Sequence, residues 1–224
     1  MERSNTFADL RRTVIWLLAL AVFLPVAAQA QNDEILEGFH YQLINPPLPP
    51  AKGEQIEVIE LFWYGCPHCY QFEPHIQDWK KKLPADVKFV RMPAVLNPQW
   101  AVHAKAYYTA ETLGVLDKIH PALFKALHVE RRRILDKSAI RDFFIEQGVS
   151  AEDFDRTFDS FGIQSKVNRS RLLGRRFGSS GVPDVIVSRK YRTSATLTGS
   201  NASVIQVINH LIDKERAERQ AAAK

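Results

Sequence analysis

Cysteine is scarce in this chain. Its 224 residues include two cysteines, Cys66 and Cys69, so any internal disulfide must join these two. The ring that this bond would close is very small, and a cross-link stabilises a fold chiefly by restricting the unfolded chain, an effect that is minimal for a short loop. The pair is therefore a poor stabiliser of the fold, and a chemical role is the better interpretation.

Long apolar runs are scarce as well. The one run that resembles a membrane segment, Val14–Leu24, follows Arg11-Arg12 and precedes small residues that end at Ala28–Ala30. Basic residues, an apolar core and an A-x-A end are typical of a secretory signal peptide, and a core of about 11 residues is shorter than the roughly 20 of a membrane-spanning helix. We expect residues 1–30 to be a signal peptide cleaved near Ala30, with an uncleaved anchor as the alternative. The arginine pair leaves Sec and twin-arginine export open.

Charge of neither sign dominates the composition. The net charge is +5 at pH 7, and cleavage after residue 30 removes three arginines and two acids, which leaves +4. Basic side chains cluster at Arg131–Arg133 and again at Arg169, Arg171, Arg175 and Arg176. Blocks of charge on helices are more often solvated faces than nucleic-acid-binding surfaces, so we expect no nucleic-acid partner.

Export decides how the cysteine spacing is interpreted. In an oxidising compartment a C-x-x-C is more often redox-active than half of a zinc site. Zinc needs four ligands, and Cys66, Cys69 and His68 in one short loop cannot surround an ion well. The other histidines show no ligand spacing: His40, His75, His103, His120, His128 and His210. We therefore expect no metal and no organic cofactor.

The apolar periodicity predicts a β-α-β unit at the start of the mature chain. About 194 residues remain after cleavage, enough for one domain with an insertion or two small domains. The proline run at 45–50 excludes a helix and predicts an extended connector. Ile56–Trp63 has the apolar character of a strand buried on both faces, and Val87–Met92 is a second strand. Between them Cys66 opens a helix, with Pro67 in its first turn and a kink at Pro74.

A long helical segment and a β-β-α unit follow. Five helices are predicted in this segment. The first covers 101–113, the second covers 116–128 with an interruption at Pro121, and the third covers 138–147 with Ser138 as its cap. A capping box of Ser150 and Asp153 starts the fourth, and the fifth covers 163–177. Strands are predicted at 184–187 and 190–193, joined by a turn at Ser188-Arg189, and a closing helix at 201–219.

Three motifs in this order resemble the DsbA family. They are Glu60 followed by Cys66-Pro67-His68-Cys69-Tyr70-Gln71-Phe72-Glu73, then Lys81-Lys82-Leu83-Pro84, then Gly181-Val182-Pro183. The family comprises periplasmic thiol:disulfide oxidoreductases of Gram-negative bacteria, and the resemblance covers nearly the whole mature chain. It implies the α/β class and a thioredoxin fold with an inserted all-helical domain. Residues 31–97 and 178–224 would form the thioredoxin-like domain, and residues 98–177 the insertion.

The position of Cys66 predicts which sulfur reacts. A cysteine at a helix N-terminus meets unpaired N–H groups and the positive end of the helix dipole, which favour thiolate over thiol. Cys66 has that position, and Cys69 lies one turn further in, so Cys66 should be the low-pKa thiol. His68 would stabilise the anion further, unless it is an ordinary exposed histidine. Pro67-His68 is the dipeptide that the family carries, and the family is itself the standard example of an acidic cysteine and an oxidising disulfide.

Val182-Pro183 is the second candidate site. In thioredoxin-like proteins this proline is cis and faces the active cysteine, and a cis X-Pro bond is a deliberate feature of a fold. The resemblance implies that the backbone of Val182 pairs with an extended substrate segment, as in strand addition. A plain turn proline before a strand is the alternative.

Glu60 is the third candidate. A lone carboxylate in an apolar strand is costly unless it is paired or neutral, and a raised pKa would suit proton exchange with Cys69. The family has a buried acid at this position; the alternative is a glutamate turned to solvent at a sheet edge. Glu73 either modulates the charge nearby or lies at the surface.

Together these residues predict an enzyme that donates its Cys66–Cys69 disulfide to newly translocated proteins through a mixed disulfide at Cys66. The expected partners are unfolded secreted proteins with free cysteines, and the resemblance implies reoxidation by a DsbB-like, quinone-linked membrane protein. We expect a monomer in the periplasm.

Two features depart from the family pattern: Asp184, where many relatives carry a small or neutral residue, and the turn without Asn-Gly at Ser188-Arg189. Because of these two features, the sequence does not predict how strongly oxidising the Cys66–Cys69 disulfide is. The rival functions are an exported reductase or isomerase, although no dimerisation domain is visible in residues 31–55, and a peptide-holding chaperone.

Overall fold

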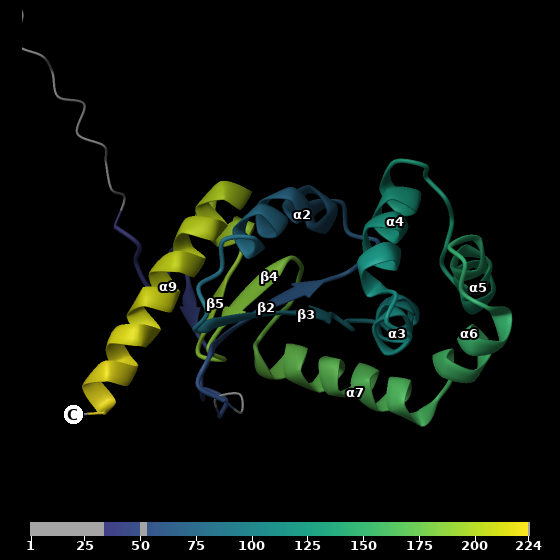
Figure 1. The fold of residues 1–224 in the computed structure, drawn as a ribbon. Helices are drawn as coiled ribbons and strands as arrows, with labels where there is room; N and C mark the ends of the chain where they lie inside the picture. The colour runs from purple at the N-terminus through teal and green to yellow at the C-terminus, as the bar shows by residue number, and fades with distance from the viewer. Residues whose placement is uncertain (1–33, 50–52, 224) are drawn as a thin grey trace, which may run out of the picture. The chain divides into compact units, whose positions relative to one another are not determined.

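A mixed five-stranded sheet organises the fold, in the order β1-β5-β4-β2-β3 (Figure 1). The computed structural model describes residues 34–49 and 53–223, and the predicted signal peptide lies outside them. The strands β2 and β3 are parallel, and the other neighbours are antiparallel. The strands are β1 (Gln42–Leu43), β2 (Ile56–Phe62), β3 (Val87–Pro93), β4 (Asp184–Val187) and β5 (Tyr191–Thr193).

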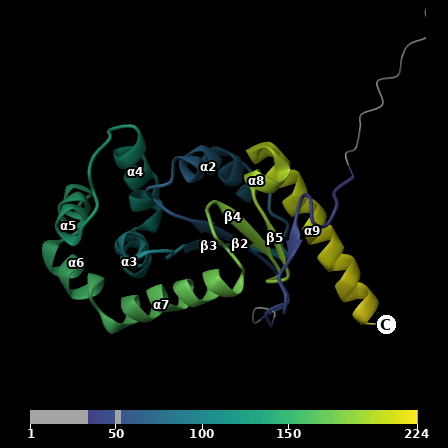
Figure 2. The ribbon, with the colours of Figure 1, turned by 180° about the vertical axis from the view of Figure 1, so that it is seen from behind.

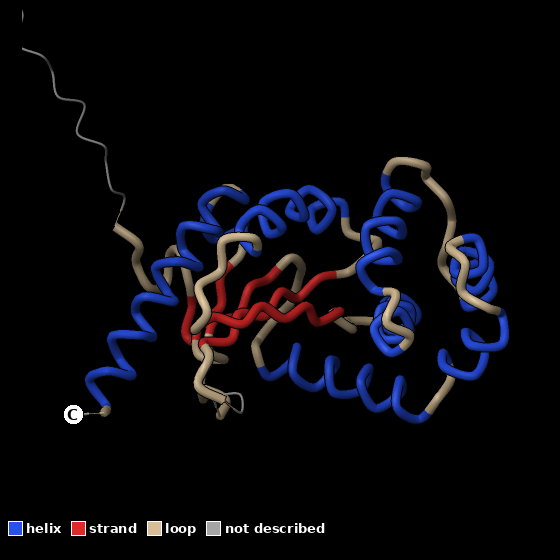
Figure 3. The backbone as a smooth tube through the Cα atoms, in the orientation of Figure 1, coloured by secondary structure: helices blue, strands red, loops and turns tan. Residues whose placement is uncertain are grey.

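Helices cover both faces of the sheet and extend beyond it (Figures 2 and 3). They are α2 (Pro67–Lys80), α3 (Pro98–Thr112), α4 (Leu116–His128), α5 (Lys137–Glu146), α6 (Ala151–Phe158), α7 (Phe161–Arg176), α8 (Ala195–Thr198) and α9 (Asn201–Ala222). Helices α3 to α7 follow one another without an intervening strand. This order confirms the predicted thioredoxin fold with a helical insertion.

Strand β2 is buried because it lies between β3 and β4. Successive side chains of a strand point to opposite faces. Val58 accordingly packs in the core that α2 and α9 share, whereas Ile59 and Leu61 pack in the core that contains Phe177 at the end of α7. By the same alternation Glu60 faces the side of α2.

The helical segment and the redox pair share one apolar core. Phe124 of α4 and Phe154 of α6 belong to the same buried cluster as Tyr64, Cys66 and Cys69. The inserted helices therefore form one wall around the start of α2.

Most predicted elements occur, with corrections at four places. The strand β1, whose two residues precede the proline run and pair with β5, was not predicted; a pairing this short leaves no alternation in the sequence. Helix α4 continues through Pro121 without the predicted interruption. Asp136, not Ser138, caps α5, and its side chain accepts a hydrogen bond from the Ala139 N–H at 2.9 Å. The one-turn helix α8 was not predicted.

Two local predictions are confirmed. The Ser150 hydroxyl accepts a hydrogen bond from the Asp153 N–H at 3.0 Å and caps α6. Ser188 and Arg189 form the turn between β4 and β5 with φ values of 51° and 56°, although neither is the asparagine or glycine that this geometry favours. Arg189 is held by an ion pair to Glu57 at 2.7 Å.

None of the helices in residues 34–49 and 53–223 combines the length and the apolar character that crossing a bilayer requires.

Candidate active site

Cys66 occupies the N-cap of α2, directly before Pro67. Its N–H donates to the carbonyl of Trp63 at 3.0 Å, which closes the turn between β2 and the helix. The residue is 8% exposed, and its thiol donates to the carbonyl of Val182 at 3.4 Å. Both Cys66 and Cys69 are thiols in this structure.

The surroundings of Cys66 favour its thiolate. A hydrogen bond from the Cys69 thiol is the largest influence, partial burial opposes it, and the backbone N–H groups of Cys69 and His68 and the charge of His68 add to it. Together they lower the pKa of Cys66 from its usual 9.0 to about 6. Helix-start N–H groups thus act on this sulfur, since no preceding turn satisfies them.

Cys69 has the opposite environment. It is 0% exposed, and burial raises its pKa far above the usual value, assisted by the hydrogen bond to Cys66 and by the charges of Cys66 and Glu60. Cys69 therefore stays protonated, and its thiol donates a hydrogen bond to the Cys66 sulfur. One sulfur is prepared as an anion and the other as its hydrogen-bond donor.

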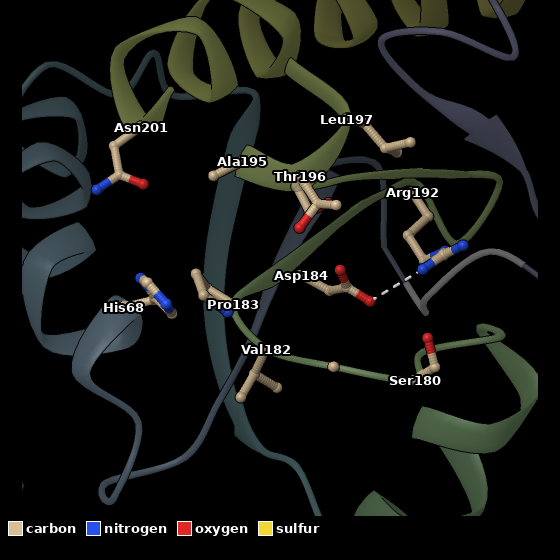
Figure 4. Close-up of a pocket in the computed structure, with 12 residues that line it drawn as sticks. His68, Ser180, Val182, Pro183, Asp184, Arg192, Ala195, Thr196, Leu197 and Asn201 are labelled. Carbon is tan, nitrogen blue, oxygen red and sulfur yellow. Dashed lines mark hydrogen bonds and ion pairs between the residues drawn. The ribbon is translucent and has the colours of Figure 1, made fainter. Parts of the chain in front are cut away.

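A groove passes beside the redox pair. The Val182-Pro183 peptide bond is cis, and the adjoining cavity measures about 510 Å³. Figure 4 shows His68 beside Pro183, with the ion pair of Asp184 and Arg192 beyond it. The other lining residues are small, polar or aliphatic: Ser180, Gly181, Val182, Ser194, Ala195, Thr196, Leu197 and Asn201. The groove thus brings together His68, Val182 and Pro183 from the predicted set.

Asp184 is a buried acid at the start of β4. Burial raises its pKa, while hydrogen bonds from Ser179 and Arg192 and the charge of Arg192 oppose the rise. The Arg192 guanidinium donates to its carboxylate at 3.2 Å. The departure from the family pattern is therefore compensated by a neighbouring cation within the groove.

Glu60 lies on the interior side of α2 and is 0% exposed. Its Oε2 accepts from Arg91 Nε at 3.0 Å, whereas Oε1 has no hydrogen-bond partner among the described residues. Burial raises the pKa of Glu60 to about 7, against the attraction of Arg91. Glu60 is thus not the solvent-facing glutamate of the alternative interpretation.

Glu73 completes an ionic cluster with Arg91. One Arg91 nitrogen donates to both Glu73 oxygens, at 3.1 and 3.0 Å. Burial would raise the pKa of Glu73, but the hydrogen bond from His120 and the charges of His120 and Arg91 outweigh it, and the pKa is lowered. Two carboxylates share one guanidinium, so the more deeply buried one, Glu60, retains a proton more readily.

Two histidines of α4 hold the turn before Cys66, and neither was predicted from the sequence to lie at the site. The Tyr64 hydroxyl lies 2.9 Å from His120 Nδ1, and His128 Nε2 lies 2.7 Å from the Tyr64 carbonyl oxygen. The other ring nitrogen of His120 lies 3.1 Å from Glu73. Since these contacts join segments more than 50 residues apart, no local spacing could have indicated them.

Within the part of the chain that the structure describes, no group of three or more His, Cys, Asp or Glu side chains is arranged to hold a metal ion.

Comparisons with known proteins agree with this geometry. The family profile described as a DSBA-like thioredoxin domain matches residues 96–203, which hold the helical segment and the cis-proline loop. The thiol:disulfide interchange protein DsbA of Pseudomonas syringae pv. tomato is 43% identical over 205 residues, which cover 92% of this chain and 95% of that protein. DsbA of Pseudomonas aeruginosa is 40% identical over 201 residues, or 90% of this chain and 94% of that one.

Solved structures give the same answer. The crystal structure of Pseudomonas aeruginosa DsbA superposes with a TM-score of 0.79 at 40% identity, over 84% of this chain and 97% of that one. The oxidoreductase DsbA from Xylella fastidiosa superposes with a TM-score of 0.74 at 28% identity, over 80% and 96% of the two chains. These whole-length likenesses confirm the resemblance drawn from the motifs: the chain belongs to the DsbA family of thiol:disulfide interchange proteins.

Proposed function

We propose that this thiol:disulfide oxidoreductase donates its Cys66–Cys69 disulfide to unfolded secreted proteins, with Cys66 as the sulfur that substrates attack. The observation that carries the proposal is the opposite environment of the two sulfurs. The pKa of Cys66 is lowered to about 6 and that of Cys69 is raised. A stabilised thiolate favours the reduced protein and makes Cys66 a good leaving group, so the disulfide is an oxidant.

The reaction takes two exchanges. A substrate thiolate attacks Cys66 Sγ, the S–S bond breaks, and Cys69 leaves with the electron pair and takes up a proton. A second substrate thiolate then attacks the substrate sulfur of the mixed disulfide, and Cys66 leaves as a thiolate. The substrate loses two electrons and gains a disulfide, and the protein gains the two electrons as a dithiol.

Glu60 is proposed as the group that exchanges the proton of Cys69. Its pKa of about 7 allows either protonation state near neutral pH, and its charge acts on the pKa of Cys69. A general acid or base works best when its pKa lies near the working pH.

Val182 and Pro183 are proposed to seat the substrate. The carbonyl of Val182 already accepts a hydrogen bond from the Cys66 thiol, so an extended peptide that pairs with this backbone would place its own sulfur near Cys66. Pro67 starts the helix that activates Cys66, and His68 forms part of the groove wall.

The setting is proposed from family membership and the N-terminal sequence. Residues 1–30 would direct export to the periplasm and be cleaved near Ala30, and the mature protein would act as a monomer. Residues 31–97 and 178–224 would form the thioredoxin-like domain around the inserted domain of residues 98–177. Reoxidation needs an acceptor of two electrons, for which a DsbB-like, quinone-linked membrane protein is proposed.

The test is the oxidation of an unfolded peptide with two cysteines by the purified, oxidised protein. The wild-type protein should oxidise the peptide, and the Cys66→Ser variant should not. The reduced Cys69→Ser variant, mixed with a single-cysteine peptide activated as its disulfide with thionitrobenzoate, should form a mixed disulfide through Cys66 and release thionitrobenzoate, and mass spectrometry should detect the product. Equal trapping by both single variants would reject the assignment of Cys66, and peptide binding without oxidation would favour the chaperone. An equilibrium with glutathione that favours the disulfide form would favour the reductase.

A further inference from the structure

The solvent side of α7 carries an unusual set of side chains. The sixteen residues of this helix include five basic side chains and no acidic one. Lys166 pairs with Glu111 of α3 at 2.9 Å. The four remaining cations have no carboxylate partner among the described residues: Arg169, Arg171, Arg175 and Arg176. By contrast, α9 combines its cations with acids, as in the Arg219–Glu215 pair at 2.8 Å.

Two large apolar side chains project from the same side of α7. Phe161 is 87% exposed and Leu172 is 59% exposed. They are eleven positions apart, about three helical turns, and therefore lie on one face. Arg169 and Arg176 are seven positions apart, about two turns, and lie next to them. We call this surface the outer face of α7; the opposite side packs inward through Ile163, Val167, Ser170 and Gly174.

We infer that the outer face of α7 docks on a bilayer surface rich in anionic phospholipids. Guanidinium groups bind phosphodiester oxygens with paired hydrogen bonds, and clustered arginines are attracted to an anionic leaflet. Phenylalanine and leucine beside basic residues are typical of helices that lie in the headgroup region. A helix of sixteen residues is about 24 Å long and can place all of these groups on one plane.

The apolar side chains favour a bilayer over an acidic protein as the partner. Phe161 projects almost completely into solvent at the first position of α7. A folded partner would need a pocket that matches it, whereas the headgroup region accepts a projecting ring without one. The predicted mature charge of +4 adds long-range attraction to an anionic surface.

Docking through α7 would leave the redox site accessible. Helices α2 and α7 lie on opposite sides of the sheet in Figures 1 and 2. The groove beside Cys66 is lined by residues of α2, β4, β5, α8, α9 and the loop before β4. Disulfide exchange could therefore proceed at a membrane surface. This inference does not depend on the proposed substrate.

The test is co-sedimentation with lipid vesicles of the protein purified after export. The protein should sediment with vesicles of phosphatidylcholine and about one third phosphatidylglycerol at low salt, and not with phosphatidylcholine alone. Replacing the four arginines by glutamine (Arg169→Gln, Arg171→Gln, Arg175→Gln, Arg176→Gln) should lower the partition coefficient at least about tenfold. Phe161→Ser should weaken binding but leave its salt dependence intact.

A matched control separates position from net charge. The substitutions Lys82→Gln, Lys88→Gln, Arg131→Gln and Arg133→Gln remove the same charge from exposed residues outside α7, and this variant should still sediment with anionic vesicles. Equal losses in the two variants would overturn the inference, as would sedimentation that phosphatidylglycerol does not improve, or retention by polyglutamate beads without binding to vesicles. Peptide oxidation should stay unchanged in both variants, and equal melting temperatures would show that both fold.

Discussion

The start of α2 around Cys66 and the interior around Cys69 are one helical turn apart and act on sulfur in opposite directions. At the start, N–H groups and the neighbouring thiol favour the anion, and the pKa of Cys66 falls to about 6. In the interior, burial dominates and the pKa of Cys69 rises. Helix α2 thus makes Cys66 a good leaving group and keeps Cys69 protonated. The free N–H groups lie at the first turn of the helix beside Cys66, whereas Cys69 lies in the core. Four experiments test this difference between the two sulfurs.

The largest effect concerns the stability of the reduced protein. Folding lowers the pKa of Cys66 from 9.0 to about 6, a factor of about a thousand in its thiol–thiolate equilibrium. A lowered pKa contributes stability that is fully present above the unfolded value and is lost as the pH falls through the folded value. The reduced protein should therefore melt above the oxidised one near pH 9, and the advantage should vanish below about pH 6. Melting curves of both forms across this range would measure it, and a difference independent of pH would contradict the contrast.

The next effect concerns proton exchange at Cys69. Glu60→Gln should slow peptide oxidation about tenfold to a hundredfold and remove a pH dependence centred near 7, because the buried carboxyl can no longer exchange its proton. Glu57→Gln is the control: it lies on the same strand but pairs with Arg189. Stopped-flow kinetics against pH would measure both variants. An unchanged profile in Glu60→Gln would show that Cys69 exchanges its proton by another route.

A smaller effect is expected from the side chain of His68. Its charge is one of several influences that lower the pKa of Cys66, whereas the N–H of the same residue acts whatever side chain it carries. His68→Gln should therefore raise the pKa of Cys66 by about one unit, a tenfold change in the equilibrium. Iodoacetamide reactivity against pH would report the value. His75→Gln, at an exposed position of the same helix, should leave it unchanged, and a rise to 9.0 in His68→Gln would mean that the helix start contributes nothing.

The smallest effect is expected at Asp184. Its charge is compensated by Arg192 at 3.2 Å, so Asp184→Asn leaves an unpaired cation in the groove. Peptides with an acidic residue beside the cysteine should react about twofold faster with the variant, since a single partly exposed charge contributes little. Rates with matched acidic and basic peptides would measure the preference. A large fall in the iodoacetamide reactivity of Cys66 would instead place Asp184 among the groups that control this sulfur.

Much of the fold and part of the site could be predicted because they depend on near neighbours. The apolar run of β2, the break before Pro67 and the cap at Ser150 each follow from a few consecutive residues. Cys66 at a helix start is a local pattern of the same kind. The strand β1 was not predicted because it forms only by pairing with the distant strand β5. The cap at Asp136 was not predicted because Ser138, two residues later, is also a residue that caps helices.

The redox pair, the helix that begins at Cys66 and the family of the chain follow from the sequence alone, since they rest on motifs and their order. The partners of the buried groups follow from the packing of the fold. Three hydrogen bonds show this. Arg91 and Glu60 are separated by 31 residues in the sequence, His120 and Tyr64 by 56 residues, and Val182 and Cys66 by 116 residues. Burial and charge act through space, so the balance that separates the two sulfurs exists only where these distant segments pack together.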